Sequence, residues 1–253
     1  MRTIERCYLR TFTRRMGRAL ADVLCPASCD YCGDRIDESA HFLCQTCWEA
    51  LAVCTTGDYC PRCGLDVSPH ALLEGSCPQC LGVAMGLDGI ARCGIYADIL
   101  QGMIPAFKNG KTELDRLLAF LTNNTLMSSG FRGSIQMFVP VPLHWSRRLA
   151  RGYNQAHLLA RGLQHPQVRV QRVLKRIRRT RPQPAVVTPA ARARNVAGAF
   201  ALRQPSLVKD IVVCLVDDVK TTGATLNECA RVLKMAGAAR VYALVLAVAG
   251  QRS

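Results

Sequence analysis

The sequence predicts an α/β fold, a parallel sheet flanked by helices, with a small cysteine-rich module before it. Two continuous apolar runs, 211–216 and 241–248, are typical of strands covered on both faces. Between them, segment 225–236 carries apolar residues on one helical face and is followed by Gly237, a common helix stop. A strand, a helix and a strand in this order predict a right-handed parallel unit.

Two further segments extend this pattern toward the N-terminus. Residues 138–142 are expected to form a short strand closing in a turn, and residues 155–162 a helix. Composition changes near residue 90, since twelve of the 14 cysteines lie between Cys7 and Cys93. We therefore predict an amphipathic helix over 1–26, the cysteine module over 27–86 and the α/β domain over 87–253.

The charge balance indicates the class of partner. Lysine and arginine total 33 against 18 acidic residues, a formal net charge of +15, which favours phosphate-rich ligands such as nucleic acid or nucleotides. Residues 172–181 are especially basic, and Arg176, Arg178 and Arg179 are the predicted nucleic-acid contacts. The chain has no apolar run of about eighteen residues and no secretory core, so we expect a cytoplasmic protein without a membrane span.

Eight of the cysteines form four Cys-x-x-Cys pairs. Each pair places two thiolates on one turn, where both reach the same ion, and two pairs complete a tetrahedron. The spacing therefore predicts two closed, structural zinc sites. The pairs combine either sequentially, as two ribbons, or alternately, as a cross-brace, and we favour sequential ribbons. The predicted ligands are Cys29, Cys32, Cys44 and Cys47 in the first quartet, and Cys60, Cys63, Cys77 and Cys80 in the second.

A second motif follows the first apolar run. Asp217 and Asp218 come at its end, a loop rich in threonine and glycine follows, and the helix predicted over 225–236 begins there. The N–H groups of a helix N-terminus bind phosphate, and Gly223 allows close approach of the backbone. Adjacent carboxylates suit the two vicinal hydroxyls of a ribose, which donate hydrogen bonds to them. The segment predicts a sugar-phosphate site at the carboxyl end of a strand.

This segment closely resembles the signature of type I phosphoribosyltransferases, and further motifs narrow the resemblance to the ComF/GntX family. The double cysteine module also fits that family, so the resemblance covers nearly the whole chain. The additional matching segments are 107–110 (Phe-Lys-Asn-Gly), 139–142 (Val-Pro-Val-Pro), 151–155 (Arg-Gly-Tyr-Asn-Gln), Thr180 with Gln183, and 194–196 (Arg-Asn-Val) with Phe200. Two departures are Pro184 directly after Gln183 and the strongly basic stretch 172–181.

The resemblance implies a type I phosphoribosyltransferase-like sheet that binds 5-phosphoribosyl 1-pyrophosphate (PRPP), with Mg²⁺ carried by the ligand. Asp217 and Asp218 would hold the ribose hydroxyls, and Arg151 and Gly152 would face the pyrophosphate. The residues expected to hold the 5-phosphate are Thr221, Thr222, Gly223, Ala224 and Thr225, and Lys220 is a further expected PRPP-binding residue. The family is associated with natural transformation and the use of external DNA, so single-stranded DNA and the DNA-uptake machinery are the expected partners.

Three functions are compatible with these motifs. The favoured one is a DNA-processing factor that binds both PRPP and single-stranded DNA. The others are a phosphoribosyltransferase acting on a base or another small acceptor, and a regulator that senses the ligand without chemistry. The sequence identifies no catalytic residue. The absence of an obvious general base does not exclude catalysis, because pyrophosphate is a good leaving group and positioning supplies much of the rate. It does not decide between enzyme and sensor, nor give the oligomeric state.

Overall fold

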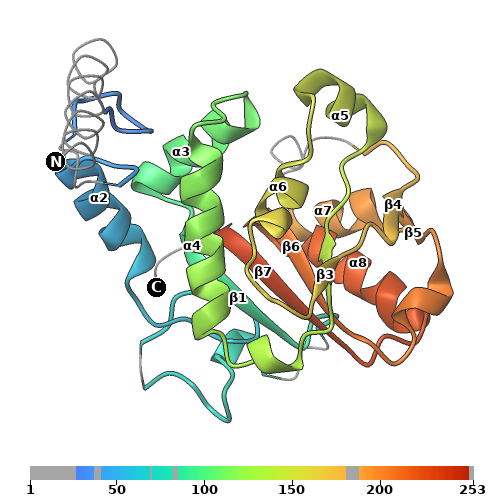
Figure 1. Cartoon of the computed structure of the whole chain (residues 1–253). Helices are drawn as coiled ribbons and strands as arrows, with labels where there is room; N and C mark the ends of the chain where they lie inside the picture. Colours follow the sequence, from blue (N-terminus) through green and yellow to red (C-terminus); the bar gives the residue numbers. More distant parts are fainter. Residues whose placement is uncertain (1–26, 37–40, 69, 82–84, 181–187, 251–253) are drawn as a thin grey trace, which may run out of the picture. The chain divides into compact units, whose positions relative to one another are not determined.

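The computed structural model describes residues 27–36, 41–68, 70–81, 85–180 and 188–250 (Figure 1). The chain divides into two compact units, 1–50 and 51–253, so the two cysteine quartets fall in different units. The predicted helix over 1–26 lies outside the described residues. The predicted boundaries after residues 26 and 86 stay predictions.

A five-stranded parallel sheet forms the centre of the larger unit, which confirms the predicted fold class (Figure 1). Both apolar runs of the sequence are neighbouring central strands of this sheet. Its order across the sheet is β1 (Gly89–Ile95), β7 (Arg240–Val248), β6 (Val212–Lys220), β2 (Met137–Pro140) and β3 (Arg169–Val170). A separate antiparallel pair consists of β4 (Leu174–Arg176) and β5 (Phe200–Leu202).

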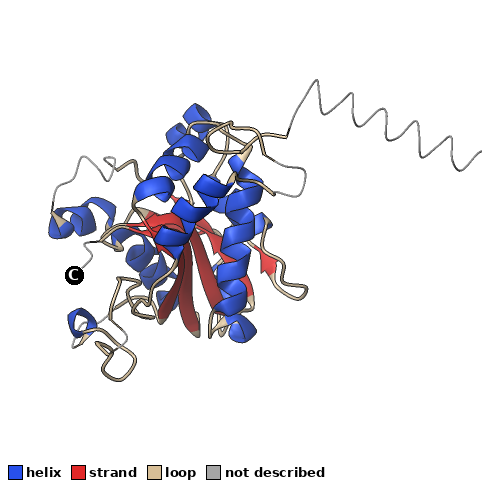
Figure 2. Cartoon of the chain, turned by 90° about the vertical axis from the view of Figure 1, so that its left-hand side faces the viewer, coloured by secondary structure: helices blue, strands red, loops and turns tan. Residues whose placement is uncertain are grey.

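Helices lie on both sides of this sheet (Figure 2). α4 packs against β1 and β7, α6 packs against β6 and β2, and α8 packs with α7 against the core. The bounds of the helices are α2 (Gln45–Thr55), α3 (Asp98–Lys108), α4 (Leu114–Ser128), α5 (Trp145–Arg151), α6 (Gln155–Arg161), α7 (Pro189–Val196) and α8 (Ala224–Met235). Short 3₁₀ turns span Pro78–Cys80, Arg132–Ser134 and Pro205–Val208.

The apolar face of α8 explains how the loop between β6 and α8 is held in place. Leu226, Cys229 and Leu233 repeat at helical spacing, and all three are buried in the same cluster as Val213 and Leu215 of β6. Burial of a leucine side chain contributes about 1.5–3 kcal/mol, so this face fixes α8 firmly beneath the strand that precedes it. The loop between β6 and α8 is therefore anchored at both ends.

β6 continues further than the sequence predicts. The apolar run ends at Val216, but the strand extends through Lys220 because β7 pairs with it along its whole length. On the other side, β2 ends at Pro140, whose partner is Val216. Beyond that pair no strand covers this edge of β6 within the described residues. The two aspartates therefore lie on a rigid strand whose free edge faces a cavity.

Candidate functional site

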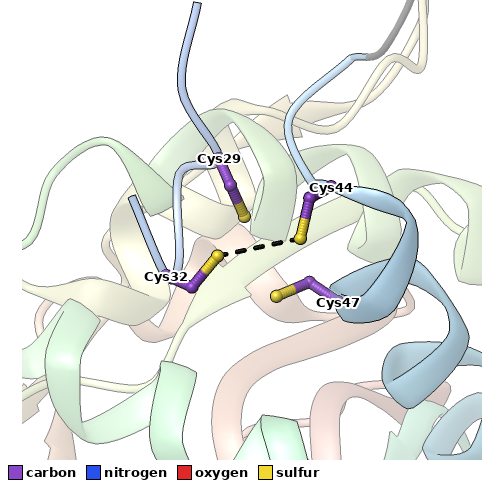
Figure 3. A group of neighbouring side chains, drawn as sticks. All are labelled: Cys29, Cys32, Cys44 and Cys47. Atoms are coloured by element: carbon purple, nitrogen blue, oxygen red, sulfur yellow. Dashed lines mark hydrogen bonds between the residues drawn. The ribbon is translucent and has the colours of Figure 1, made fainter. Parts of the chain in front are cut away.

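The first quartet brings Cys29, Cys32, Cys44 and Cys47 together, with all four sulfur atoms directed at a common centre (Figure 3). Cys29 and Cys32 lie on a turn, whereas Cys44 and Cys47 lie at the beginning of α2. The four sulfur atoms lie within 4.8 Å of one another, and those of Cys32 and Cys44 are 3.7 Å apart. The structure thus groups the pairs sequentially, as favoured from the sequence.

The second quartet has the same arrangement and is fully buried. The separation is 3.7 Å between the sulfur atoms of Cys63 and Cys77, 3.6 Å between those of Cys77 and Cys80, and 3.9 Å between those of Cys60 and Cys80. A tetrahedron with Zn–S bonds of about 2.3 Å has edges of about 3.8 Å. The donor set and its dimensions therefore fit structural zinc. Gly64 follows the first pair at φ 77°, a conformation that favours glycine in this turn.

Backbone N–H groups lower the pKa of one cysteine thiol in each quartet. Burial raises the pKa of the Cys60 thiol, but N–H groups of Cys77, Cys63 and Arg62 outweigh it and lower that pKa to about 7. The corresponding residue of the first quartet, Cys29, has its pKa lowered to about 6 by N–H groups that outweigh its burial. The thiolate is the form that binds zinc, so the lowered pKa favours metal binding at Cys29 and Cys60.

Protein purified without added metal is expected to contain close to two zinc ions per chain, one for each cluster of four cysteines. Elemental analysis measures this directly, and titration of free thiols provides the control for oxidation. A content below one zinc ion per chain, with all thiols unmodified, would contradict the assignment of both clusters.

The second zinc ribbon is packed against the sheet of its own unit. The carbonyl of Pro61 accepts a hydrogen bond from the N–H of Ile90 in β1, at 2.8 Å. Asp66 forms an ion pair with Arg92, whose guanidinium lies 4.9 Å from the ring centroid of Tyr59. Ribbon and edge strand are thus joined by a backbone hydrogen bond, an ion pair and a cation–π contact.

A cavity of about 540 Å³ opens at the carboxyl end of β6, and we call it the β6 cavity. Three chain segments far apart in the sequence meet there: the β6–α8 loop, the C-terminal part of α3 and the turn after β2. Of the predicted ligand-binding residues, those lining it are Asp217, Asp218, Lys220, Thr221, Gly223, Ala224, Thr225 and Arg151. Thr222 and Gly152 do not line this cavity, although each lies beside a residue that does.

The loop at the base of the cavity has the geometry of a phosphate cradle. Gly223 is the N-cap of α8 at φ 78°, a left-handed conformation that favours glycine. A Cβ at this position would lie 3.1 Å from Cε of Lys220, so a side chain would also crowd the lysine. The positive dipole end of α8 and the lysine ammonium together favour an anion.

Lys220 is 6% exposed, so its charge is held in a partly desolvated place. Burial lowers the pKa of Lys220, and the nearby thiolates of the second quartet act in the opposite direction. Lys220 pairs in the sheet with Val248, and a Cβ on Gly64 of the ribbon would contact Val248 at 3.0 Å. The ribbon therefore lies one strand away from the residue at which β6 ends and the β6–α8 loop begins.

The two aspartates have different surroundings. Asp218 forms an ion pair with Lys108 of α3, in which Oδ2 of Asp218 lies 2.9 Å from Nζ of Lys108. Burial raises the pKa of Asp217 to about 7, and the charge of Asp218 adds to this effect, while the N–H of Asp218 and the charges of Lys108 and Arg176 oppose it. This raised pKa favours the protonated form of Asp217 more than in an ordinary aspartate, and a ligand that donates hydrogen bonds to the carboxylate would favour its ionised form.

With PRPP as the ligand, we expect affinity to increase as the pH rises through about 7, because the ionised carboxylate of Asp217 would be a stronger acceptor for ribose hydroxyls than the protonated carboxyl. Below the pKa, each pH unit is expected to cost about tenfold in affinity through this group. Calorimetric titrations between about pH 6 and pH 8 test this. The ligand's own phosphate titration is common to wild type and Asp217→Asn, so parallel profiles of the two proteins would contradict the role of Asp217.

The raised pKa of Asp217 also determines how the free energy of unfolding changes with pH. The folded-state pKa of Asp217 lies above the ordinary value of 3.8, so its contribution to the free energy of unfolding is fully present below pH 3.8. That contribution is lost as the pH rises through about 7. Ligand binding and stability therefore depend on the protonation of this carboxyl in opposite directions.

Sequence reasoning did not assign Tyr96, Lys108 or Arg176 to this cavity, although all three line it. Lys108 lies in one of the family motifs, which was the available signal. Arg176 was predicted as a nucleic-acid contact. The structure places its guanidinium over the ring of Phe200, 5.1 Å from the centroid, and hydrogen-bonded to Thr180.

The other two predicted nucleic-acid contacts line none of the cavities described for the chain. Arg178 is exposed, but its guanidinium donates hydrogen bonds to the carbonyl oxygens of Asn195 and Ala197, at 3.0 and 2.7 Å. Arg179 is exposed on the surface. Their contact with nucleic acid stays a prediction. Within the part of the chain that the structure describes, no helix has both the length and the apolar character to span a membrane.

Comparison with known proteins identifies the family. The family model of the double zinc ribbon domain matches residues 20–81, and that of the phosphoribosyl transferase domain matches residues 115–253. "DNA utilization protein YhgH" of Salmonella typhimurium is 31% identical over 223 residues, covering 85% of this chain and 94% of that protein. The chain belongs to the ComF/GntX family.

Other members of the ComF/GntX family are similar over most of their length. "Competence protein F" of Haemophilus influenzae is 29% identical over 231 residues, covering 87% of this chain and 96% of that protein. "Competence protein ComFC" of Bacillus subtilis is 28% identical over 209 residues, covering 78% and 80%. Among solved structures, the allosteric regulatory enzyme of purine biosynthesis matches at 21% identity and a TM-score of 0.31, over 52% of this chain and 24% of that one, a likeness too low to bear on the fold.

Proposed function

We propose that this chain binds PRPP together with Mg²⁺ in the β6 cavity and binds single-stranded DNA, and that it acts in the cytoplasm on DNA taken up from outside. The observation that carries the proposal is the composition of the cavity. Two carboxylates on a rigid strand, a phosphate cradle with Lys220, and Arg151 converge on one space. This is the set of groups that a phosphorylated ribose bearing a second anionic group requires.

Each part of the ligand has a counterpart in the cavity. The ribose hydroxyls would donate to Asp217 and Asp218, and the 5-phosphate would accept from the loop over 221–225. Arg151 lines the same cavity and would bind the pyrophosphate through charge-assisted hydrogen bonds. Magnesium would be held mainly by pyrophosphate oxygens and water, as is usual for this ion with phosphorylated ligands.

The role in DNA handling rests on the relatives and on charge. The matched relatives are named for competence and for DNA utilization, and the chain's net charge of +15 suits a polyanion. Association with the DNA-uptake machinery belongs to the same proposal.

Two titrations on the intact protein test the function. Calorimetry with PRPP and Mg²⁺ is expected to show binding that ribose 5-phosphate alone reproduces only weakly. Fluorescence anisotropy with a single-stranded oligonucleotide and with its duplex, over a salt series, is expected to show tighter binding of the single strand and a steep loss with salt. Absence of PRPP binding would refute the ligand assignment, and equal affinity for duplex would refute the preference for single strands.

A further inference from the structure

A second cavity of about 610 Å³ adjoins the β6 cavity, and we call it the α5 cavity. α5, α6, β4 and the residue after β5 contribute to its walls. Its lining shares Pro142, Leu143 and Arg176 with the β6 cavity, so the two spaces meet at a common wall. Of its lining, only Gly152 and Arg176 were assigned to a ligand from the sequence, so the other residues of this cavity have no assigned partner.

The charged residues of the α5 cavity all carry positive charge. Arg172, Lys175 and Arg203 are exposed there, and Arg176 completes the set, while the lining contains no aspartate or glutamate. Among the described residues, none of the three exposed cations forms a salt bridge. Charges that are not neutralised within the protein create a local positive potential that attracts an anionic ligand.

The pKa of a histidine in this cavity is also affected by nearby positive charges. His157 on α6 is part of the lining, and its pKa is lowered by burial and by the charges of Arg172 and Arg161. The ring is therefore held neutral, with hydrogen-bonding atoms available. The Nδ1 atom of His157 is buried without a partner among the described residues.

Ring and apolar side chains lie beside these cations. Trp145 at the start of α5 is 65% exposed, and Leu149, one turn later on the same helix, is 74% exposed. Both line the α5 cavity, and Tyr153 lies in the same wall. A large exposed indole next to unneutralised cations is the combination that binds single-stranded nucleic acid, because bases stack on the ring while the phosphates meet the charges.

We propose that the α5 cavity holds a segment of single-stranded DNA, with a base stacked on Trp145 and the adjoining phosphates at Arg172, Lys175 and Arg203. The inference rests on the proposed function and specifies where its nucleic acid lies. A paired duplex does not fit this description, because its bases are stacked inside and offer no free face to the indole. The common wall places the bound strand beside the proposed PRPP site.

Removing the three cations provides the first test. The variant Arg172→Gln, Lys175→Gln, Arg203→Gln is expected to bind an oligodeoxythymidylate at least roughly tenfold more weakly than wild type. The slope of log affinity against log salt should fall by about 2, since each phosphate contact on a single strand contributes about 0.7. PRPP binding by the same variant should be unchanged, which also shows that the protein is folded.

A matched variant controls for net charge. Arg116, Arg169 and Lys209 are exposed and line neither cavity, so Arg116→Gln, Arg169→Gln, Lys209→Gln removes the same charge elsewhere. It is expected to keep most of the affinity and the wild-type salt slope. Equal losses in the two triple variants would overturn the proposal, because they would show that only net charge matters.

The indole provides an independent test. The chain has two tryptophans, so Trp48→Phe leaves Trp145 as the only one. Its fluorescence should be quenched by the single strand and not by PRPP, and Trp145→Ala should lower the affinity for the strand by roughly tenfold, with partial recovery in Trp145→Phe. Unchanged fluorescence on saturation with DNA would overturn the stacking arrangement. Absence of DNA binding by the wild type would instead refute the proposed function itself, and the inference with it.

Discussion

Replacing Asp217 and Asp218 together with asparagine is expected to lower the affinity for PRPP at least about a hundredfold. The substitution keeps the size of both side chains, but each amide directs a donor at a ribose hydroxyl that needs an acceptor. Hydrogen bonds to charged groups contribute about 1.5–3 kcal/mol each, and a hundredfold corresponds to about 2.8 kcal/mol. Lys108 loses its ion-pair partner in the same variant, which weakens its placement in the cavity.

Folding should survive this double substitution. Asp217 is destabilised in its ionised form by burial and by Asp218, so neutral side chains relieve that cost above pH 7. Binding of single-stranded DNA should be retained, because the change only makes the chain more basic. Calorimetry with PRPP and a salt-matched DNA titration measure both. Wild-type affinity for PRPP in the double variant would refute the assigned ribose contacts.

A control pair removes two negative charges at another place. Glu113→Gln with Asp115→Asn alters the start of α4, outside the β6 cavity. This pair is expected to leave PRPP affinity within about twofold of wild type. A large loss in the control would show that the affinity follows total charge rather than the two aspartates.

The two zinc sites are expected to differ strongly in their effect on the α/β domain. Replacing Cys77 and Cys80 with serine should remove one zinc ion and lower the thermal midpoint of that domain by at least roughly 10 °C. Structural zinc contributes about 10–16 kcal/mol in isolated zinc-finger peptides, and about 1 kcal/mol moves the midpoint of a domain this size by 2–4 °C. Leu65 of the second ribbon packs against the main core, so loss of this metal reaches the sheet.

The matched variant alters the first quartet. Replacing Cys29 and Cys32 also removes one zinc ion, but these residues belong to the compact unit over 1–50 and not to the unit that contains the sheet. Its midpoint for the α/β domain is expected to stay within a few degrees of wild type. Calorimetric unfolding with parallel zinc analysis measures this difference. Equal midpoints in the two variants would contradict an integral role of the second ribbon.

The sequence predicts the parts of this site that lie in one continuous segment. The apolar run over 211–216, the adjacent aspartates and Gly223 define strand, carboxylates and phosphate loop, because each follows from local backbone requirements. The regular Cys-x-x-Cys spacing predicts both metal clusters for the same reason. These features depend on residues close in sequence, where periodicity and turn chemistry are informative.

The remaining parts of the site are brought together by tertiary packing. Lys108 and Arg176 reach the β6 cavity from segments about 110 and 40 residues away from Asp218. Apart from the family motif that contains Lys108, nothing in the surrounding sequence indicates that they meet there. The packing of the second ribbon on β1 is equally non-local, since Asp66 meets Arg92 only across the fold. The cysteine content falls near residue 90. The contacts between the second ribbon and the sheet join residues on both sides of this change in composition.

The second ribbon lies against an edge strand of the sheet that could otherwise pair with another molecule. β1 is the edge of the sheet, and all seven of its residues are buried. An uncovered apolar edge strand is a template onto which a strand of another molecule can add. Pro61 covers this edge by accepting the N–H of Ile90, and the metal holds the turn that carries Pro61. We therefore expect loss of zinc from this site to expose the edge strand and to promote aggregation of the protein.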